Sequence, residues 1–165
     1  MQMSYQIHTK AGIGHVHLTV SDLERAIEFY NEMLGFAVTA RFGATAAFLS
    51  SGSYHHHIGL NTWAGEDVTP PPPGHSGLYH FAILYPDRKE LAKAFKVLWE
   101  RKYHIEGASD SGISESVYIK DPDGNGIELY YDRPHDEWPV DEDGNLIHFT
   151  KALDLPDLLS ELNNS

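Results

Sequence analysis

The chain has 165 residues and no cysteine, and its 24 acidic residues against 12 basic ones give a formal net charge of −12. This length is typical of one domain, expected to span 1–165, that buries a core without disulfides. The missing cysteine excludes a disulfide scaffold, a thiolate zinc site and a cysteine nucleophile. The acidic balance argues against nucleic-acid binding, which needs clustered Lys and Arg. No apolar run approaches the roughly 20 residues of a membrane span, and the polar N-terminus does not resemble a signal peptide, so we expect a cytoplasmic protein without membrane contact.

A first structural unit is predicted over 11–65. It opens at His15 with a strand, HVHLTV, and continues with apolar residues at helical spacing: Leu23, Ala26, Ile27, Tyr30 and Leu34. Ser21 and Glu24 have the spacing of a capping box, and Gly35 is placed to end the helix. Three strand-like segments follow, FAVTARF, TAAFLSS and HHHIGLNTW, so the unit is predicted to be βαβββ.

A second unit, predicted over 77–132, repeats this order from His80, 65 residues after His15. In both units an aspartate follows the histidine by seven residues and precedes a helical pattern. The apolar positions of the second helix are Leu91, Ala94, Phe95 and Leu98. The strands are predicted in YHIEGAS, ESVYIKD and GIELYYD. An internal repeat of this kind is stronger evidence for a fold than either half alone.

The remaining segments join and follow the two units. Four consecutive prolines at 70–73 exclude helix and central strand, so 66–76 is predicted to be a linker. The tail, 133–165, is expected to form a loop, a short strand at 146–149 and a helix at 154–162. The fold class is therefore predicted to be α+β, with two tandem βαβββ units whose sheets form a curved half-barrel around a central cup.

Three residues are candidates for a metal site in that cup. His15 and His80 open equivalent strands, so pairing of the units would direct both imidazoles toward one axis. Glu128 lies between Ile127 and Leu129, so its side chain is on the opposite face from theirs. A carboxylate on the cup side is costly unless it is paired or binds a metal. Two histidines and one carboxylate form the facial triad typical of non-haem Fe(II), although spacing alone also allows ordinary strand histidines and an outward-facing Glu128.

The segments HVHLTVSDLERAIEFYNEMLGF, YHFAILYPDRKELA and YIKDPDGNGIELYYDRP resemble the vicinal oxygen chelate superfamily over about 11–138. This family includes glyoxalase I, fosfomycin-resistance and bleomycin-resistance proteins and extradiol dioxygenases. YHHHIGLNTW, DEWP and ALDLPDLL are most similar to its catechol 2,3-dioxygenase-like branch. The resemblance implies that His15, His80 and Glu128 bind a divalent metal, Fe(II) first and Mn, Ni or Zn as alternatives. It also implies a homodimer.

The same resemblance implies extradiol cleavage of a catechol-like aromatic substrate with O2, a reaction of aromatic compound catabolism. His56 falls where these enzymes keep an acid–base histidine, and Tyr118 where they keep a tyrosine that contacts the bound catechol. The chain departs from the pattern at Ser111, where many relatives have histidine. It also holds one double unit where many have two.

Three other functions remain open at this stage. A glyoxalase-like lyase or isomerase would add a fourth ligand, a carboxylate, where this chain has Gly59. A thiol transferase of the fosfomycin-resistance type uses the same three ligands. A drug-binding protein of the bleomycin-resistance type needs no metal. His17 shares a face with His15 and is a further candidate for the cup lining, with Phe48, Phe81 and Trp63 as possible walls.

Overall fold

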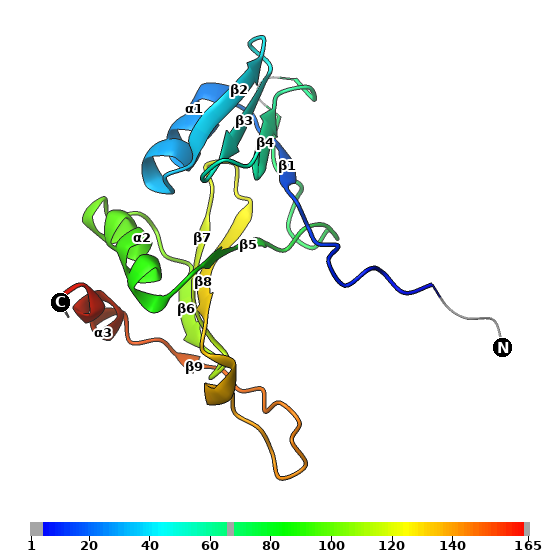
Figure 1. Cartoon of the computed structure of the whole chain (residues 1–165). Coiled ribbons are helices and arrows are strands. Elements are labelled where there is room, and N and C mark those ends of the chain that lie inside the picture. The colour runs from blue at the N-terminus through cyan, green and yellow to red at the C-terminus, as the bar shows by residue number, and fades with distance from the viewer. Residues whose placement is uncertain (1–4, 66–67, 164–165) are drawn as a thin grey trace.

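The computed structural model describes residues 5–65 and 68–163, and its elements follow the order β-α-β-β-β twice (Figure 1). The first unit contains β1 (Val16–Thr19), α1 (Leu23–Glu28) with a π-helical continuation (Phe29–Met33), β2 (Ala37–Phe42), β3 (Ala46–Ser50) and β4 (Ile58–Asn61). The second contains β5 (Phe81–Tyr85), α2 (Arg88–Glu100), β6 (Gly107–Asp110), β7 (Ser114–Lys120) and β8 (Gly126–Asp132). Both predicted βαβββ units are confirmed.

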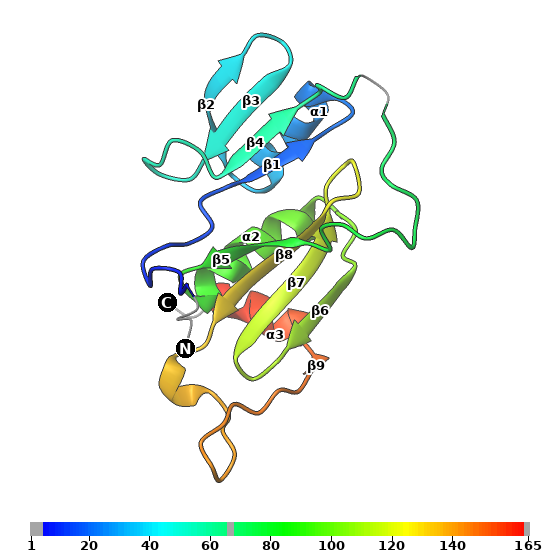
Figure 2. The ribbon, with the colours of Figure 1, turned by 90° about the vertical axis from the view of Figure 1, so that its right-hand side faces the viewer.

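Each unit forms its own mixed sheet. The first sheet has the order β1-β4-β3-β2, and the second has the order β5-β8-β7-β6-β9. The pairs β1·β4 and β5·β8 are parallel, and the other pairs are antiparallel. Within the described residues, no strand of one sheet pairs with the other, so the sheets are not closed into a barrel (Figure 2). The α+β class is confirmed, and β1 and β5 remain edge strands.

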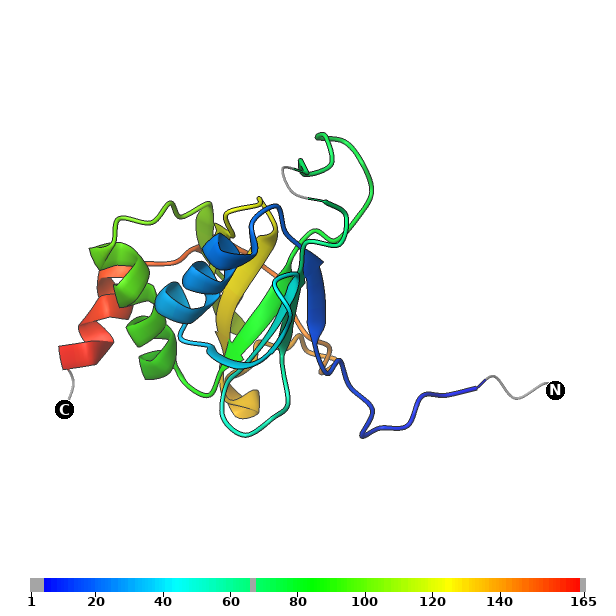
Figure 3. The ribbon, with the colours of Figure 1, turned by 90° about the horizontal axis from the view of Figure 1, so that it is seen from above.

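The helices cover one face of the sheets and leave the other open, as the view from above shows (Figure 3). The helical spacing predicts this arrangement, because Leu91, Phe95 and Leu98 of α2 form one apolar stripe that is fully buried. Buried residues of both units form a single hydrophobic cluster under the helices. None of the helices among the described residues is long and apolar enough to cross a lipid bilayer.

Side chains of the first unit form hydrogen bonds to the turn that leads into β8. The Tyr30 hydroxyl donates a hydrogen bond to Asp121 Oδ2 at 2.9 Å, and both side chains are buried. Burial, reinforced by the Asp121 carboxylate, raises the pKa of Tyr30. In the same turn, Asp123 Oδ1 accepts a hydrogen bond from Arg25 Nη2 of α1 at 3.0 Å. These contacts join α1 and its continuation directly to the second unit.

The predicted capping box at Ser21 and Glu24 is wrong by one residue. Asp22 is the N-cap of α1, and its carboxylate accepts from the Arg25 amide at 3.0 Å. The Ser21 hydroxyl instead donates to Asp123 Oδ1, a partner that local sequence does not reveal. The end of this helical segment follows the prediction, because Gly35 adopts a positive φ of 79° just after it.

The linker and tail agree with the sequence only in part. Residues 68–76 contain neither helix nor strand, as the prolines predict, while 66–67 lie outside the described residues. The predicted strand at 146–149 is wrong, because that stretch holds only an isolated bridge between Val140 and Leu146. The tail strand lies later. The tail elements are a 3-10 turn (His135–Glu137), β9 (Lys151–Ala152), α3 (Leu155–Ser160), which confirms the final helix, and a second 3-10 turn (Glu161–Asn163).

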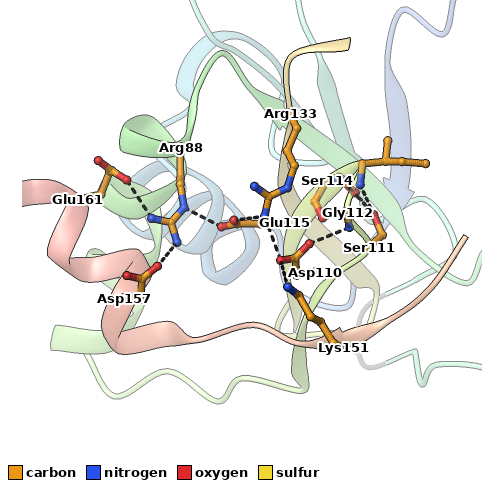
Figure 4. Close-up of polar contacts among 11 residues, drawn as sticks. Arg88, Asp110, Ser111, Gly112, Ser114, Glu115, Arg133, Lys151, Asp157 and Glu161 are labelled. Carbon is orange, nitrogen blue, oxygen red and sulfur yellow. Dashed lines mark hydrogen bonds and ion pairs between the residues drawn. The ribbon is translucent and has the colours of Figure 1, made fainter. Parts of the chain in front are cut away.

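Charged side chains attach the tail to the second unit (Figure 4). Arg88, at the start of α2, donates to the buried Glu115 on β7 at 2.8 Å and to Asp157 and Glu161 of the tail at 2.7 and 2.9 Å. Arg133 contacts Glu115 at 2.6 Å from the other side. Two arginines thus neutralise one buried carboxylate, and one of them also holds α3 against α2.

Candidate functional site

Two of the three predicted metal ligands lie together on the open face of the second sheet. His80 immediately precedes β5, and Glu128 lies on the neighbouring strand β8. His80 Nε2 is 3.0 Å from Glu128 Oε2. Ile127 and Leu129 are buried toward the helices, so alternation directs Glu128 to the other face, as the sequence predicts. An imidazole nitrogen and a carboxylate oxygen thus meet where a small molecule can reach them.

Tyr118 hydrogen-bonds to the other oxygen of the Glu128 carboxylate. Tyr118 lies directly opposite Glu128 in the β7·β8 register, and its hydroxyl donates to Glu128 Oε1 at 3.1 Å. Its ring is 5.9 Å from the His80 ring, centroid to centroid. Ser109 Oγ on β6 is 3.3 Å from the Tyr118 hydroxyl. Sequence reasoning placed Tyr118 near the substrate but did not identify its carboxylate partner or Ser109.

A glycine that sequence reasoning did not single out brings His80 to Glu128. A Cβ on Gly126 would lie 2.3 Å from the carbonyl oxygen of Tyr79 and 3.0 Å from His80 Cβ. Backbone cannot give way as a flexible side chain can, so only glycine lets the chain before β5 approach β8 this closely. In the sequence, Gly126 ends the segment DPDGNG, whose proline and glycines indicate a turn but not this close approach of another strand.

The third predicted ligand, His15, lies with the candidate acid–base residue His56. Their ring centroids are 4.5 Å apart, and His56 also contacts Phe48 at 4.9 Å. Burial, and then the neighbouring imidazoles led by His15, lower the pKa of His56. This shift favours the neutral ring, which can accept a proton. Of the three consecutive histidines, His57 packs its ring beside that of Phe36.

His17 continues this row of rings across the first sheet. Its centroid is 6.0 Å from that of Phe48 and 5.4 Å from that of Trp63. The ring leans over Gly59, the residue paired with His17 in the β1·β4 register. A Cβ on Gly59 would lie only 2.8 Å from His17 Cγ. The His17 imidazole therefore fills the space that a side chain at position 59 would occupy.

His15 and the His80–Glu128 pair do not meet within one chain. Across the described ranges 5–65 and 68–163, no three His, Asp or Glu side chains are grouped so that they could hold a metal ion. His15 borders a cavity of about 240 Å³ between β1 and β5, whose lining includes Phe81 and Ala82. His80 and Tyr118 border a separate cavity of about 310 Å³. The two parts of the predicted triad thus face neighbouring hollows.

Ser111, which stands where many relatives have histidine, stabilises the turn between β6 and β7. Its hydroxyl accepts from the amides of Ser114 and Ile113 at 3.0 and 3.3 Å (Figure 4). The following residue, Gly112, has a positive φ of 78°, and a Cβ there would lie 2.5 Å from the Phe149 ring of the tail. Position 111 is thus part of a tight turn covered by the tail.

Comparison with known proteins gives a consistent result. Residues 12–129 match the model of the Glyoxalase/Bleomycin resistance protein/Dioxygenase superfamily. A catechol-2,3-dioxygenase of Bacillus subtilis is 41% identical over 155 residues, which cover 94% of this chain and 53% of that protein, so the chain spans about half its length. The glutathione transferase FosA of Serratia marcescens is 29% identical over 72% of this chain and 79% of its own.

The fold has matching solved structures as well. A glyoxalase/dioxygenase from Nostoc punctiforme superposes with a TM-score of 0.64 at 22% identity, over 81% of this chain and 99% of that one. Together with the duplicated βαβββ order, the family match assigns the fold and the lineage. The chain belongs to the glyoxalase/bleomycin resistance protein/dioxygenase superfamily.

Proposed function

We propose that the chain is an extradiol-type dioxygenase that cleaves a catechol-like aromatic ring with O2 at a site built from His15, His80 and Glu128. The observation that carries the proposal is the contact of His80 Nε2 with Glu128 Oε2 on the open sheet face. The name of the 41% identical relative, a catechol-2,3-dioxygenase, supports the substrate class.

The donor set fits a divalent metal, with Fe(II) first and Mn, Ni or Zn as alternatives. Two imidazoles and one carboxylate are the ligands typical of non-haem Fe(II) sites with open positions. His80 and Glu128 already converge, and His15 would complete the set. When bound, the metal would act as a Lewis acid and as a template for the substrate oxygens and O2.

His56 and Tyr118 would handle protons and hydrogen bonds at the substrate. His56 lies against His15 and would take a proton from a catechol hydroxyl and return it later. The Tyr118 hydroxyl donates its proton to Glu128 Oε1, so its oxygen would accept a hydrogen bond from a substrate hydroxyl. The rings of Phe48, His17 and Trp63 are tilted against one another and would offer aromatic faces and edges to an aromatic substrate.

Gly59 favours this function over that of a four-ligand glyoxalase. A lyase of that type would need a carboxylate at position 59, and His17 occupies the space from which it would project. Thiol transfer remains the second candidate, because the relative FosA is named a glutathione transferase and the same three ligands would serve it. A metal-free drug-binding role is less favoured, since it would not require the His80–Glu128 contact.

The test is to load the protein with Fe(II) without oxygen, add a panel of catechols and admit air. We expect a yellow ring-opened product from at least one catechol and none from a Glu128→Ala variant that has lost its iron. Iron bound with no product from any catechol would contradict the proposal. Product from fosfomycin and glutathione instead would favour the thiol transferase.

We also propose that the protein works as a homodimer whose copies complete the site together. Within the described residues His15 stands apart from the His80–Glu128 pair, and β1 and β5 are unpaired edges. Exposed apolar side chains lie beside both edges, including Ile13, which is 95% exposed, and Leu84, which is 55% exposed. A second copy could cover these side chains and bring the missing imidazole to the pair.

A further inference from the structure

We propose that Ser109 is a positioning residue for Glu128, acting through the Tyr118 hydroxyl, and that the tail strand β9 keeps Ser109 in place. The inference rests on the proposed function, because it assigns Glu128 to a metal. It goes beyond that function by giving roles to a strand serine and to the tail.

The two hydrogen bonds at Tyr118 have a fixed direction. An ionised carboxylate only accepts, so the single phenolic proton of Tyr118 is donated to Glu128 Oε1 at 3.1 Å. The phenolic oxygen can then only accept from Ser109 Oγ, 3.3 Å away. Ser109 thus donates to Tyr118 and Tyr118 donates to the Glu128 carboxylate, which accepts, and each hydrogen bond strengthens the next.

This series of hydrogen bonds engages only one oxygen of the Glu128 carboxylate and leaves the other, Oε2, available to a metal. Tyr118 engages Oε1, while Oε2 faces His80 Nε2 at 3.0 Å. Groups that hydrogen-bond to a metal ligand fix its orientation, and their loss typically weakens metal binding by about 10- to 100-fold. Ser109 lies one bond further from the metal, so we expect a smaller effect from its loss.

The tail holds Ser109 from its other side. Ser109 pairs with Ala152 of β9, and the Leu153 amide donates to the Ala108 carbonyl at 3.4 Å. The adjacent residue in the tail, Lys151, contacts Asp110 at 3.2 Å (Figure 4). Because β6 would otherwise be an exposed edge strand, β9 restricts the backbone that carries the Ser109 hydroxyl.

The experiment measures Mn(II) binding to the full chain by electron paramagnetic resonance, with and without Ser109. We expect Ser109→Ala to raise the Mn(II) dissociation constant by about three- to tenfold, the worth of one neutral hydrogen bond. Tyr118→Phe should raise it further, and Ser109→Thr, which keeps the hydroxyl, should restore it. The matched control is Ser116→Ala, since Ser116 lies opposite Ser109 on β7 and its hydroxyl has no hydrogen-bond partner among the described residues.

The outcomes separate this inference from the proposed function. A wild-type protein that binds no Mn(II) through His80 and Glu128 would overturn both. Wild-type binding that Ser109→Ala leaves unchanged would overturn the role of Ser109 and leave the metal site standing. Weakened binding that Ser109→Thr does not restore, or that Ser116→Ala reproduces, would show general loosening of the strand pair and would also overturn it.

Discussion

At the scale of single residues, the position of His80 depends on the missing side chain of Gly126. Replacing Gly126 with Ala places a methyl group 2.3 Å from a backbone oxygen, so the chain before β5 must move away from β8. We predict that Gly126→Ala weakens Mn(II) binding at least tenfold and lowers the free energy of unfolding by about 1–3 kcal/mol, the usual cost of overpacking.

Gly77→Ala is the control for this change, because a Cβ on Gly77 meets nothing within 4 Å. Its effect on unfolding should stay within about 0.5 kcal/mol. Metal titration and urea denaturation of both variants measure the difference. Equal metal affinity in the two variants would mean that His80 does not depend on the close approach at Gly126.

At the scale of elements, the charge cluster around Glu115 connects α2 to the tail helix. Replacing Arg88 with Met removes one of the two arginines that neutralise this buried carboxylate and both of its contacts to the tail. We predict a loss of about 3 kcal/mol in the free energy of unfolding, because removing one partner leaves a buried charge poorly compensated. Hydrogen exchange should also quicken in α3 (Leu155–Ser160).

The matched control on the same helix is Lys93→Met. Lys93 forms a solvent-exposed pair with Glu90, and such pairs contribute about 1 kcal/mol or less. Urea denaturation compares the two variants. Destabilisation of similar size in both would mean that Glu115 is satisfied without Arg88.

Sequence predicted the elements well and their distant partners poorly, and the reason is physical. Apolar spacing reports which face of a helix or strand is buried, so α2 and the side of β8 that carries Glu128 could be predicted. Ser21 has a good capping sequence, yet Asp123, about a hundred residues away, takes its hydroxyl. The tail strand was misplaced because β9 is only two residues long and forms by pairing with β6. No local pattern encodes such a partner.

In the candidate site, too, the sequence predicted the positions of residues but not the contacts between them. The repeat located His15 and His80, and alternation located Glu128, but nothing in the sequence reports that Gly126 admits a neighbouring backbone or that Tyr118 binds the carboxylate. The family resemblance supplied roles, and the structure supplied contacts. Their metal-binding and catalytic roles remain predictions.

At the scale of the whole molecule, the separation of His15 from the other two ligands makes dimerisation testable. Light scattering should give a mass of twice the 18.5 kDa chain. We further predict that His15→Ala and Glu128→Ala variants, each unable to bind iron, regain about a quarter of wild-type iron when they are unfolded and refolded together. Random pairing makes half of the dimers mixed, and each mixed dimer has one intact site of its two.

The control is each variant refolded alone, which should stay free of iron. A dimer that gains nothing on mixing would mean that each chain assembles its own three ligands. A monomeric mass would contradict the dimer itself.

The hydrogen bonds from Tyr30 and Arg25 to the turn before β8 limit how the two units of a duplicated chain can change separately in evolution. The two units look like interchangeable modules, yet Asp121 and Asp123 of the second accept hydrogen bonds from the first. A recombination that exchanged either unit for that of a relative would break a buried phenol–carboxylate contact unless both halves moved together. We therefore expect the two units to be exchangeable only together, and Glu128 lies on β8, the strand that follows this contact.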